Sequence, residues 1–383
     1  MTSFTRSQLL LSFLFFLAIF LAVWGEIHHF VRDTHIFTFF AATVAAVIAT
    51  VQSSGKTRDS RLMLAAFLLG LTLLEGTALL IERRPNLTVT DGWSVSRPVI
   101  GWGPGHSGIL HARKQKAGGE LIYQVDYTID DNLLRQTRSA SNGPAVVFFG
   151  DSFTFGEGVN DSDTLPQQFA DLRHQQDRVL NLGFSGYGPQ QFLRGVEAGY
   201  YDKIIGDQPK IFFFLTAPWH AQRTACKASW LARAPRYHLT DEGIAFDGQC
   251  REEGFNLFLS EFLYNTAFYR FFLTPFAERL THDDVELYIR VVLEAVRQSK
   301  AKYGVETIIP YLPDGEPYLA GTGFTDQDIV ERFEAAGAKV IDASLTDVKN
   351  PRLGLEIPSD GHPTGRANRL RAELLIDSSI NRL

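Results

Sequence analysis

Two different patterns of apolar residues divide the chain. The N-terminal part holds three long apolar stretches, at residues 7–25, 36–53 and 62–81, and the last of them contains a single charged residue, Glu75. A helix needs roughly 20 residues to cross the hydrocarbon core of a bilayer, with about 17 as a lower limit. The pattern therefore predicts three transmembrane helices, which together form an anchor over residues 1–84.

Two other interpretations fit parts of this pattern. The first stretch follows Arg6 and has the length of a signal peptide, but no small-x-small cleavage site comes after it. Buried helices of a soluble domain are the second alternative. We expect a retained three-helix anchor in which Glu75 faces another helix or a partner, because a carboxylate is costly in lipid.

Basic residues indicate how this anchor is oriented. They gather in the loop 53–61 and at Arg6. The positive-inside rule then places this loop and the N-terminus in the cytoplasm, and everything after Ile81 outside. Arg83 and Arg84 oppose this orientation, since they are basic residues on the outer flank.

Residues 85–383 have the pattern of an α/β domain. A loop-rich lead-in is expected to about Gly143, and after it short apolar runs alternate with amphipathic stretches. This alternation predicts a three-layer architecture with a parallel sheet between helices. The expected strands are Ala145–Phe149, Arg178–Leu182, Lys210–Leu215, Glu306–Pro310 and Lys339–Asp342, and the expected helices are Thr164–Arg173, Pro189–Tyr200, Asp283–Lys302, Thr325–Ala336 and Thr364–Ser379.

An insertion at about 219–282 interrupts the alternation. Ala232–Gly248 is predicted to be a hairpin with its turn at Asp241-Glu-Gly. Asn256–Leu273 is predicted to be a strongly aromatic helix, either packed on the sheet edge or serving as a lid or membrane-facing surface. Cys226 and Cys250 both fall in this insertion. Outside the membrane they are expected to pair, whereas in the cytoplasm they would be two separate thiols.

The charge balance narrows the possible partners. The 383 residues include 37 Lys and Arg against 43 Asp and Glu, a formal net charge of −6. A weakly acidic chain without a basic run is not expected to bind nucleic acid.

Candidate chemistry lies at the first and last elements of the predicted sheet. Ser152 follows the apolar run that ends at Gly150, at the carboxyl end of a strand, where open α/β sheets bind their ligands. If a helix starts there, the Ser152 N–H also points at the site and can stabilise an oxyanion. Near the C-terminus, His362 comes two residues after Asp360. A serine nucleophile, a histidine base and an aspartate that orients it are the groups that acyl transfer needs.

Two neighbouring motifs are interpreted as structural. Gly183-Phe-Ser185-Gly186 lacks the last glycine of a nucleophile elbow, because Tyr187 stands there. Gly156-Glu-Gly158 lacks the third glycine of a dinucleotide fingerprint.

These residues resemble the SGNH (GDSL-like) hydrolase superfamily, in the form of its membrane-anchored bacterial members. Gly150-Asp151-Ser152 matches the first block, Asn181–Gly188 is similar to the second, and Asp360-Gly-His362 is similar to the last. The resemblance implies a flavodoxin-like sandwich with five parallel strands, in which Gly186 donates a second oxyanion N–H. It implies no metal and no cofactor.

Two features depart from the family pattern. Asp360 lies two residues before His362 rather than three, as in polysaccharide O-acetyltransferases. The third-block Asn, a side-chain oxyanion donor, is missing, and Trp219 stands at its position with His220 and Arg223 after it. We expect His220 to line the pocket and to replace the missing donor.

The function expected from this resemblance is that of an extracytoplasmic serine esterase. Such an enzyme acts through an acyl-enzyme on acylated cell-envelope glycan or lipid, with its domain in the periplasm and its anchor in the inner membrane. The first alternative is an O-acyltransferase that transfers an acyl (acetyl) group to a polysaccharide and draws on a membrane protein for its acyl donor. The second alternative is a non-catalytic binding or assembly protein, which the lost Asn favours.

Overall fold

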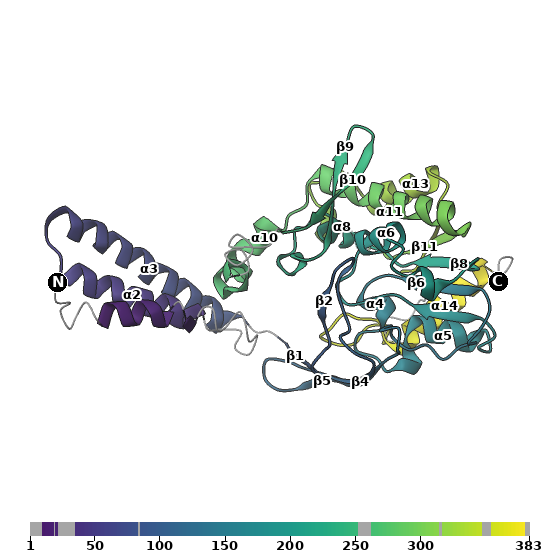
Figure 1. Cartoon of the computed structure of the whole chain (residues 1–383), viewed down its shortest axis with the longest axis horizontal. Helices are drawn as coiled ribbons and strands as arrows, with labels where there is room; N and C mark the ends of the chain where they lie inside the picture. The colour runs from purple at the N-terminus through teal and green to yellow at the C-terminus, as the bar shows by residue number, and fades with distance from the viewer. Residues whose placement is uncertain are drawn as a thin grey trace. The chain divides into compact units, whose positions relative to one another are not determined.

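The computed structural model describes residues 10–18, 20–21, 35–82, 85–251, 262–313, 316–346 and 354–379. The chain divides into two compact units (Figure 1). Unit 1 comprises Met1–Arg84 and Glu253–Ala277, and unit 2 comprises Pro85–Glu252 and Glu278–Leu383. The predicted boundary after residue 84 matches this division, but part of the insertion belongs to unit 1 rather than to the α/β unit.

Unit 1 is built around an antiparallel helix pair, α2 (His35–Val51) and α3 (Gly55–Ile81). The pair is held by close packing and by a hydrogen bond of 3.0 Å between the Thr43 and Thr72 hydroxyls. The described part of the insertion, residues 262–277, is called the aromatic segment below. It contains a helical turn at 262–265, the π-helical turn η3 (Tyr269–Leu273) and α10 (Thr274–Ala277).

The prediction of three transmembrane helices is not supported. Among the described residues, α3 is the one helix long and apolar enough to cross a membrane. The second stretch forms α2, whose 17 residues fall short of the roughly 20 that a span needs. The first stretch lies partly outside the described residues, which are helical at 10–18 and 20–21.

The prediction of a five-stranded parallel sheet is confirmed in unit 2. The strands lie in the order β12-β11-β8-β6-β7, and every pairing is parallel. Counted along the chain this is the order 2-1-3-4-5 of a flavodoxin-like sheet, whose switch point lies between β6 and β8. The strands are β6 (Ala145–Phe149), β7 (Arg178–Asn181), β8 (Ile211–Phe214), β11 (Thr307–Tyr311) and β12 (Lys339–Asp342).

Helices cover both faces of this sheet, which explains why its strands are apolar runs. Phe149 and Phe212 point into one core, together with the helices α6 and α11, whereas Phe148 and Phe213 point into the other, together with α5 and α14. The helices and helical turns of unit 2 are α4 (Ser152–Phe155), η1 (Asp161–Asp163), α5 (Leu165–Leu172), α6 (Pro189–Glu197), α7 (Asp202–Ile205), α8 (His220–Thr224), η2 (Ser229–Leu231), α11 (His282–Tyr303), α12 (Glu316–Leu319), α13 (Asp326–Ala335) and α14 (Gly365–Ser379).

The lead-in to the domain is not the loop region that the sequence predicts. It forms a three-stranded antiparallel sheet, β1-β4-β5, and a small ribbon, β2-β3. Polar and charged side chains alternate with buried ones along β4, so its apolar signal is weak. The bounds are β1 (Asn86–Val89), β2 (Val95–Arg97), β3 (Gly101–Gly103), β4 (Gly108–Gln115) and β5 (Leu121–Ile129).

The predicted hairpin is present in the insertion. It consists of β9 (Pro235–Thr240) and β10 (Gly243–Gln249), and its turn falls where the sequence places it. Cys226 and Cys250 form a disulfide that links the chain after α8 to the end of this hairpin.

Candidate active site

Ser152 lies at the turn between β6 and α4, at the carboxyl end of β6. Gly150 makes this turn possible, because a Cβ at that position would lie 2.2 Å from the Thr154 hydroxyl oxygen. Asp151 is the N-cap of α4, and its carboxylate accepts a hydrogen bond of 2.9 Å from the Phe153 N–H. Ser152 is therefore the first residue of α4 and is 7% exposed. Its backbone is held by the turn at Gly150 and by the N-cap hydrogen bond of Asp151.

The structure brings Ser152, His362 and Asp360 together, as the sequence predicts. His362 Nε2 lies 2.8 Å from Ser152 Oγ, and His362 Nδ1 lies 2.6 Å from Asp360 Oδ2. Because an ionised carboxylate can only accept, Nδ1 carries the proton toward Asp360 and Nε2 accepts from the serine hydroxyl. This is the arrangement of a nucleophile, its base and the group that orients the base.

Lys114 is a member of this site that the sequence did not reveal. It projects from β4, and its ammonium donates a hydrogen bond to Asp360 Oδ1, while His362 occupies Oδ2. Burial opposes the charge of Asp360, but the hydrogen bonds from His362 and Lys114 outweigh it and lower the pKa of Asp360 to about 2. The orienting carboxylate is thus ionised at neutral pH.

A second carboxylate faces the histidine from the loop after α4. Glu157 Oε2 lies 4.0 Å from His362 Nε2, and it accepts a hydrogen bond of 2.5 Å from the Ser185 hydroxyl. Burial of the imidazole disfavours its charged form, but the hydrogen bond with Asp360 and the negative charge of Glu157 outweigh burial and raise the pKa of His362. The sequence analysis did not assign Glu157 to the site, because Gly156-Glu-Gly158 was interpreted as a structural motif. Its place five residues after Ser152 was the signal that could have indicated it.

Trp219, at the position of the missing Asn, and the following His220 and Arg223 all contact Asp151. The Oδ2 atom of Asp151 accepts hydrogen bonds from Trp219 Nε1 at 3.1 Å, His220 Nε2 at 3.1 Å and Arg223 Nη1 at 2.7 Å. Burial opposes the charge of Asp151, but the Arg223 guanidinium and the His220 hydrogen bond outweigh it and hold the pKa of this carboxyl well below its usual range.

The oxyanion role predicted for His220 does not fit this arrangement. His220 is fully buried, and burial lowers its pKa, so its ring is neutral. Its Nε2–H donates to Asp151, and its Nδ1 accepts from the Thr216 hydroxyl at 2.8 Å. Both ring nitrogens are therefore engaged with the protein, and His220 positions the carboxylate that precedes Ser152.

Gly186 lies in the turn after β7, at φ +80°, a conformation that side-chain-bearing residues rarely adopt. A Cβ there would lie 2.6 Å from the Trp230 ring. The same turn is held by Trp102, whose indole N–H donates to the Ser185 carbonyl at 2.9 Å. Only glycine fits this position, which matches the motif that singled it out.

Aromatic rings form a wall beside the triad. The Phe153 ring lies 5.5 Å from the His362 ring and 5.3 Å from the Trp219 ring, measured between centroids. The Trp219 ring thus packs beside Phe153, the residue after Ser152, while its indole N–H donates to Asp151.

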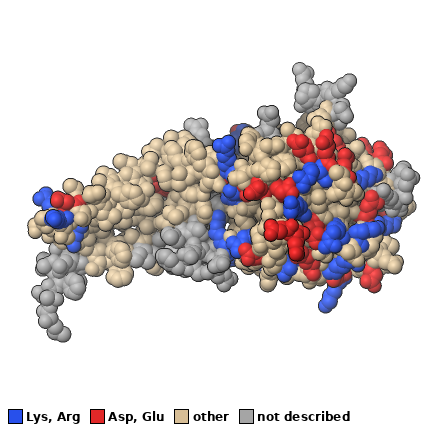
Figure 2. All heavy atoms as spheres, turned by 90° about the horizontal axis from the view of Figure 1, so that it is seen from above, with Lys and Arg blue, Asp and Glu red and all other residues tan. Residues whose placement is uncertain are grey.

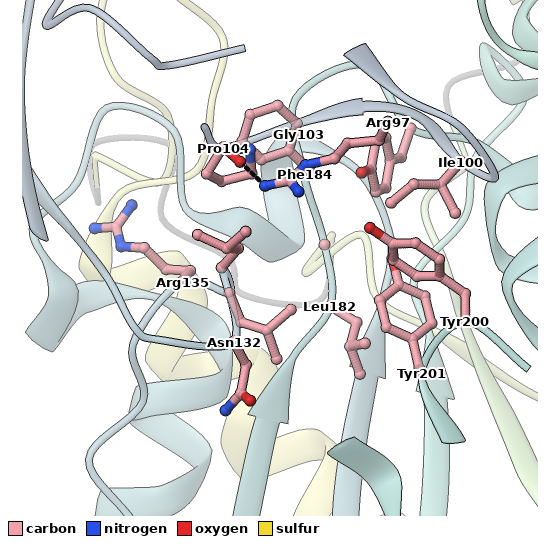
Figure 3. A pocket seen from close by; sticks show the side chains of 14 residues that line it. Arg97, Ile100, Gly103, Pro104, Asn132, Arg135, Leu182, Phe184, Tyr200 and Tyr201 are labelled. Carbon is pink, nitrogen blue, oxygen red and sulfur yellow. Dashed lines mark hydrogen bonds between the residues drawn. The ribbon is translucent and has the colours of Figure 1, made fainter. Parts of the chain in front are cut away.

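A small cavity of about 30 Å³, drawn from close by in Figure 3, is lined by Gly183, Phe184 and Tyr187 among other residues and by none of the triad residues. Tyr200 and Tyr201 lie on one side of it and Asn132 on the other, and Arg97 donates a hydrogen bond to the Pro104 carbonyl at its rim. Its volume suits about one water molecule, so it is too small for an acyl group. Within the described parts of the chain, no group of three or more His, Cys, Asp or Glu side chains has the arrangement of a metal site.

Comparisons with known proteins give structural neighbours alone. No protein-family model matches the chain, and no curated protein matches it. Among solved structures, a lipolytic protein of the G-D-S-L family from Veillonella parvula is 14% identical, with 63% of this chain and 100% of that chain covered and a TM-score of 0.37.

A second solved neighbour is the psychrotrophic esterase EstA from Pseudoalteromonas, in a structure inhibited by monoethylphosphonate. It is 14% identical, with 62% of this chain and 98% of that chain covered and a TM-score of 0.36. Since these likenesses are distant, we take the chemistry from the geometry of the site.

Proposed function

We propose that this protein is a serine hydrolase of the SGNH kind that cleaves acyl esters through an acyl-enzyme on Ser152. The observation that carries the proposal is the continuous hydrogen-bonded chain from Ser152 Oγ through His362 to Asp360, with distances of 2.8 and 2.6 Å. A turn serine and a helix-start histidine with structural roles alone would have no need of an ionised carboxylate behind the imidazole.

Acylation begins when Ser152 Oγ attacks the ester carbonyl and its proton passes to His362 Nε2. The carbonyl oxygen of the ester becomes an oxyanion, which the N–H groups of Ser152 and Gly186 stabilise in this proposal. Asp360 stabilises the imidazolium, which then gives its proton to the leaving alkoxide. The products of this half-reaction are an alcohol and the acyl-Ser152 ester.

Deacylation repeats these steps with a new acceptor. His362 removes a proton from water, and the hydroxide attacks the acyl-enzyme to release a carboxylic acid and free Ser152. If a sugar hydroxyl takes the place of water, the product is an O-acylated glycan and the enzyme is an acyltransferase. The short Asp360–His362 spacing, which resembles that of polysaccharide O-acetyltransferases, favours this second candidate.

The proposed location is the inner membrane, with unit 2 in the periplasm. Three observations support it: α3 is long and apolar enough to span a bilayer, its first turns carry Lys56, Arg58 and Arg61, and Cys226 is bonded to Cys250. Disulfides persist in oxidising compartments and are rare in the cytosol. The substrate class that fits this location is acylated cell-envelope glycan or lipid.

The test uses the full chain in detergent with a fluorophosphonate, which forms a stable bond with an activated serine. We expect mass spectrometry to locate the adduct on Ser152 and the protein to hydrolyse a short-chain nitrophenyl ester. The Ser185→Ala variant, which keeps the Ser152–His362 pair, is the matched control and should still be labelled.

The outcomes separate the candidates. No labelling and no turnover in a folded protein would favour a non-catalytic binder. Faster release of nitrophenol when a glycan acceptor is added, with acylated glycan as the product, would favour the transferase.

A further inference from the structure

Glu75 is an ionisable residue in the apolar part of α3, yet it is 1% exposed. Its two carboxylate oxygens accept hydrogen bonds from the backbone N–H groups of Ala267, at 2.8 Å, and Phe268, at 2.7 Å. Both donors belong to the aromatic segment. A carboxylate in an apolar helix is therefore used to bind the backbone of a segment distant in sequence.

The backbone N–H groups of residues 267–270, where the longer helical part of the aromatic segment begins, all have acceptors. Besides the two N–H groups bound by Glu75, the Tyr269 N–H donates to the Thr266 hydroxyl at 3.1 Å, and the Arg270 N–H donates to the Thr266 carbonyl at 3.2 Å. The first N–H groups of a helix usually rely on water or a cap. In lipid, where water is absent, each has to be satisfied by the protein.

The contacts of the segment also indicate its depth along α3. Glu75 lies about 9 Å along the helix axis from Ile81, at the rise of an α-helix. Arg270 forms an ion pair of 2.8 Å with Glu82, the residue directly after α3. The backbone at Ala267 is thus level with the apolar part of α3. Arg270, the one charged residue of the aromatic segment, reaches Glu82 at the C-terminal end of that helix.

The surface of the segment is apolar where it is exposed. The exposed fractions are 47% for Leu263, 41% for Phe271, 39% for Leu273 and 80% for Phe276. The neighbouring surface of α3 is similar, with Leu73 61% exposed. On the face shown in Figure 2, unit 1 is nearly free of charged side chains away from the hairpin end, where α3 begins.

We propose that the aromatic segment enters the bilayer beside α3, on the side of Ile81, and that its exposed side chains contact lipid acyl chains. Glu75 holds it there by accepting its backbone hydrogen bonds. The proposal rests on the membrane location proposed above for α3. It gives the chain a second attachment to the membrane, made by a segment that lies between β10 and α11 of the enzymatic unit.

The test measures the surroundings of single positions in the full-length protein, reconstituted in phosphatidylcholine vesicles. Cysteine is introduced at Leu263 or Phe271 and labelled with an environment-sensitive fluorophore. Leu73→Cys in α3 is the lipid control, and Leu121→Cys, at an exposed position of β5, is the aqueous control. Quenching by lipids with brominated acyl chains is compared with quenching by iodide in the buffer.

We expect the probes at Leu263 and Phe271 to be quenched by brominated lipid as strongly as the probe at Leu73, and weakly by iodide. Iodide quenching like that at Leu121 would overturn the inference. Protection from both quenchers would also overturn it, in favour of a second copy or a partner protein covering the segment. If the probe at Leu73 itself reports water, the membrane location of α3 fails instead.

A pair of variants tests the role of Glu75. In Glu75→Ala the two N–H groups lose their acceptor, so the probe at Leu263 should become several-fold more accessible to iodide. Thr77→Ala alters an exposed residue of the same helix and should leave the probe unchanged. Equal accessibility in both variants would show that Glu75 does not hold the segment.

Discussion

Asp151 and Asp360 are two buried carboxylates beside the same serine, and their partners give them different tasks. Asp360 contacts the imidazole and Lys114, so it orients and stabilises the base. Asp151 contacts the α4 backbone and the group of three donors that follows β8, so it holds the turn that carries Ser152. The residues at the position of the Asn in the superfamily pattern thus hold the turn that carries Ser152.

The catalytic assignment predicts distinct losses for two substitutions. Ser152→Ala should remove acyl-enzyme formation and lower kcat on the order of 10⁶-fold. Asp360→Asn should keep the geometry but favour the wrong histidine tautomer, with a loss of about 10⁴-fold. Single-turnover measurements on a nitrophenyl ester check both, and Glu331→Ala, at an exposed position of α13, is the control. An active Ser152→Ala protein would show that another group is the nucleophile.

Glu157 predicts a change in the pH profile. His362 accepts a proton only when neutral, so a raised pKa moves the acid limb of kcat/KM above the usual range of histidine. Asp360, Glu157 and Asp151 all contribute to this rise, and Glu157→Gln removes one of these charges. The acid limb should therefore shift to lower pH in Glu157→Gln. An unchanged profile would mean that Glu157 does not act on the imidazole.

At the scale of elements, the residues of the site come from two sheets, one parallel and one antiparallel. The parallel strand β6 and the turn into α4 place Ser152, while the antiparallel strand β4 brings Lys114 to the loop that holds Asp360 and His362. The β1-β4-β5 sheet therefore contributes a side chain to the candidate active site.

The disulfide predicts a stability effect at the same scale. Cys226 and Cys250 are 24 residues apart, and closing a loop of this length stabilises the folded state by roughly 3 kcal/mol in the chain-entropy model. Replacing both cysteines with serine should lower the thermal midpoint by several degrees, measured by circular dichroism, while Ser152 stays reactive. Alkylation of both cysteines in denatured, non-reduced protein would show that the bond is absent.

At the scale of the whole molecule, two units with opposite surface chemistry share one chain. Charged side chains cover unit 2, while unit 1 is largely apolar on the face that Figure 2 shows. The chain passes between them at residues 84–85, 252–253 and 277–278. Unit 2 is therefore joined covalently to unit 1 through its insertion as well as through its start.

The proposed topology predicts the compartment of each side of α3. A reporter that is active only outside the cytoplasm should be active when fused after Asn86 and silent when fused at Gly55. Fusions of a reporter that is active only in the cytoplasm should show the reverse. Activity of the first reporter at Gly55 would overturn both the orientation and the expectation of an oxidising compartment for the cysteines.

The sequence by itself determined the central sheet and the triad. Short apolar runs that alternate with amphipathic stretches are typical of the strands of a parallel sheet, and all five strands were predicted close to their observed bounds. Ser152 directly follows such a run, and Asp360 and His362 come shortly before the last helix, so their order, spacing and resemblance to known blocks predicted that they meet at one edge of the sheet.

Only the tertiary structure decided which side chains meet around the triad. Lys114 and Glu157 come from elements whose sequence patterns predict exposed or structural roles, and they reach His362 or Asp360 through pairings between distant segments. His220 stands next to the missing Asn in sequence, but the fold brings its Nε2 to Asp151 Oδ2, the same atom that Trp219 and Arg223 contact. The partners of Glu75 could not be predicted either, because every residue except proline has a backbone N–H and the sequence does not distinguish those that bind a carboxylate. The fold alone brings the N–H groups of Ala267 and Phe268 to Glu75.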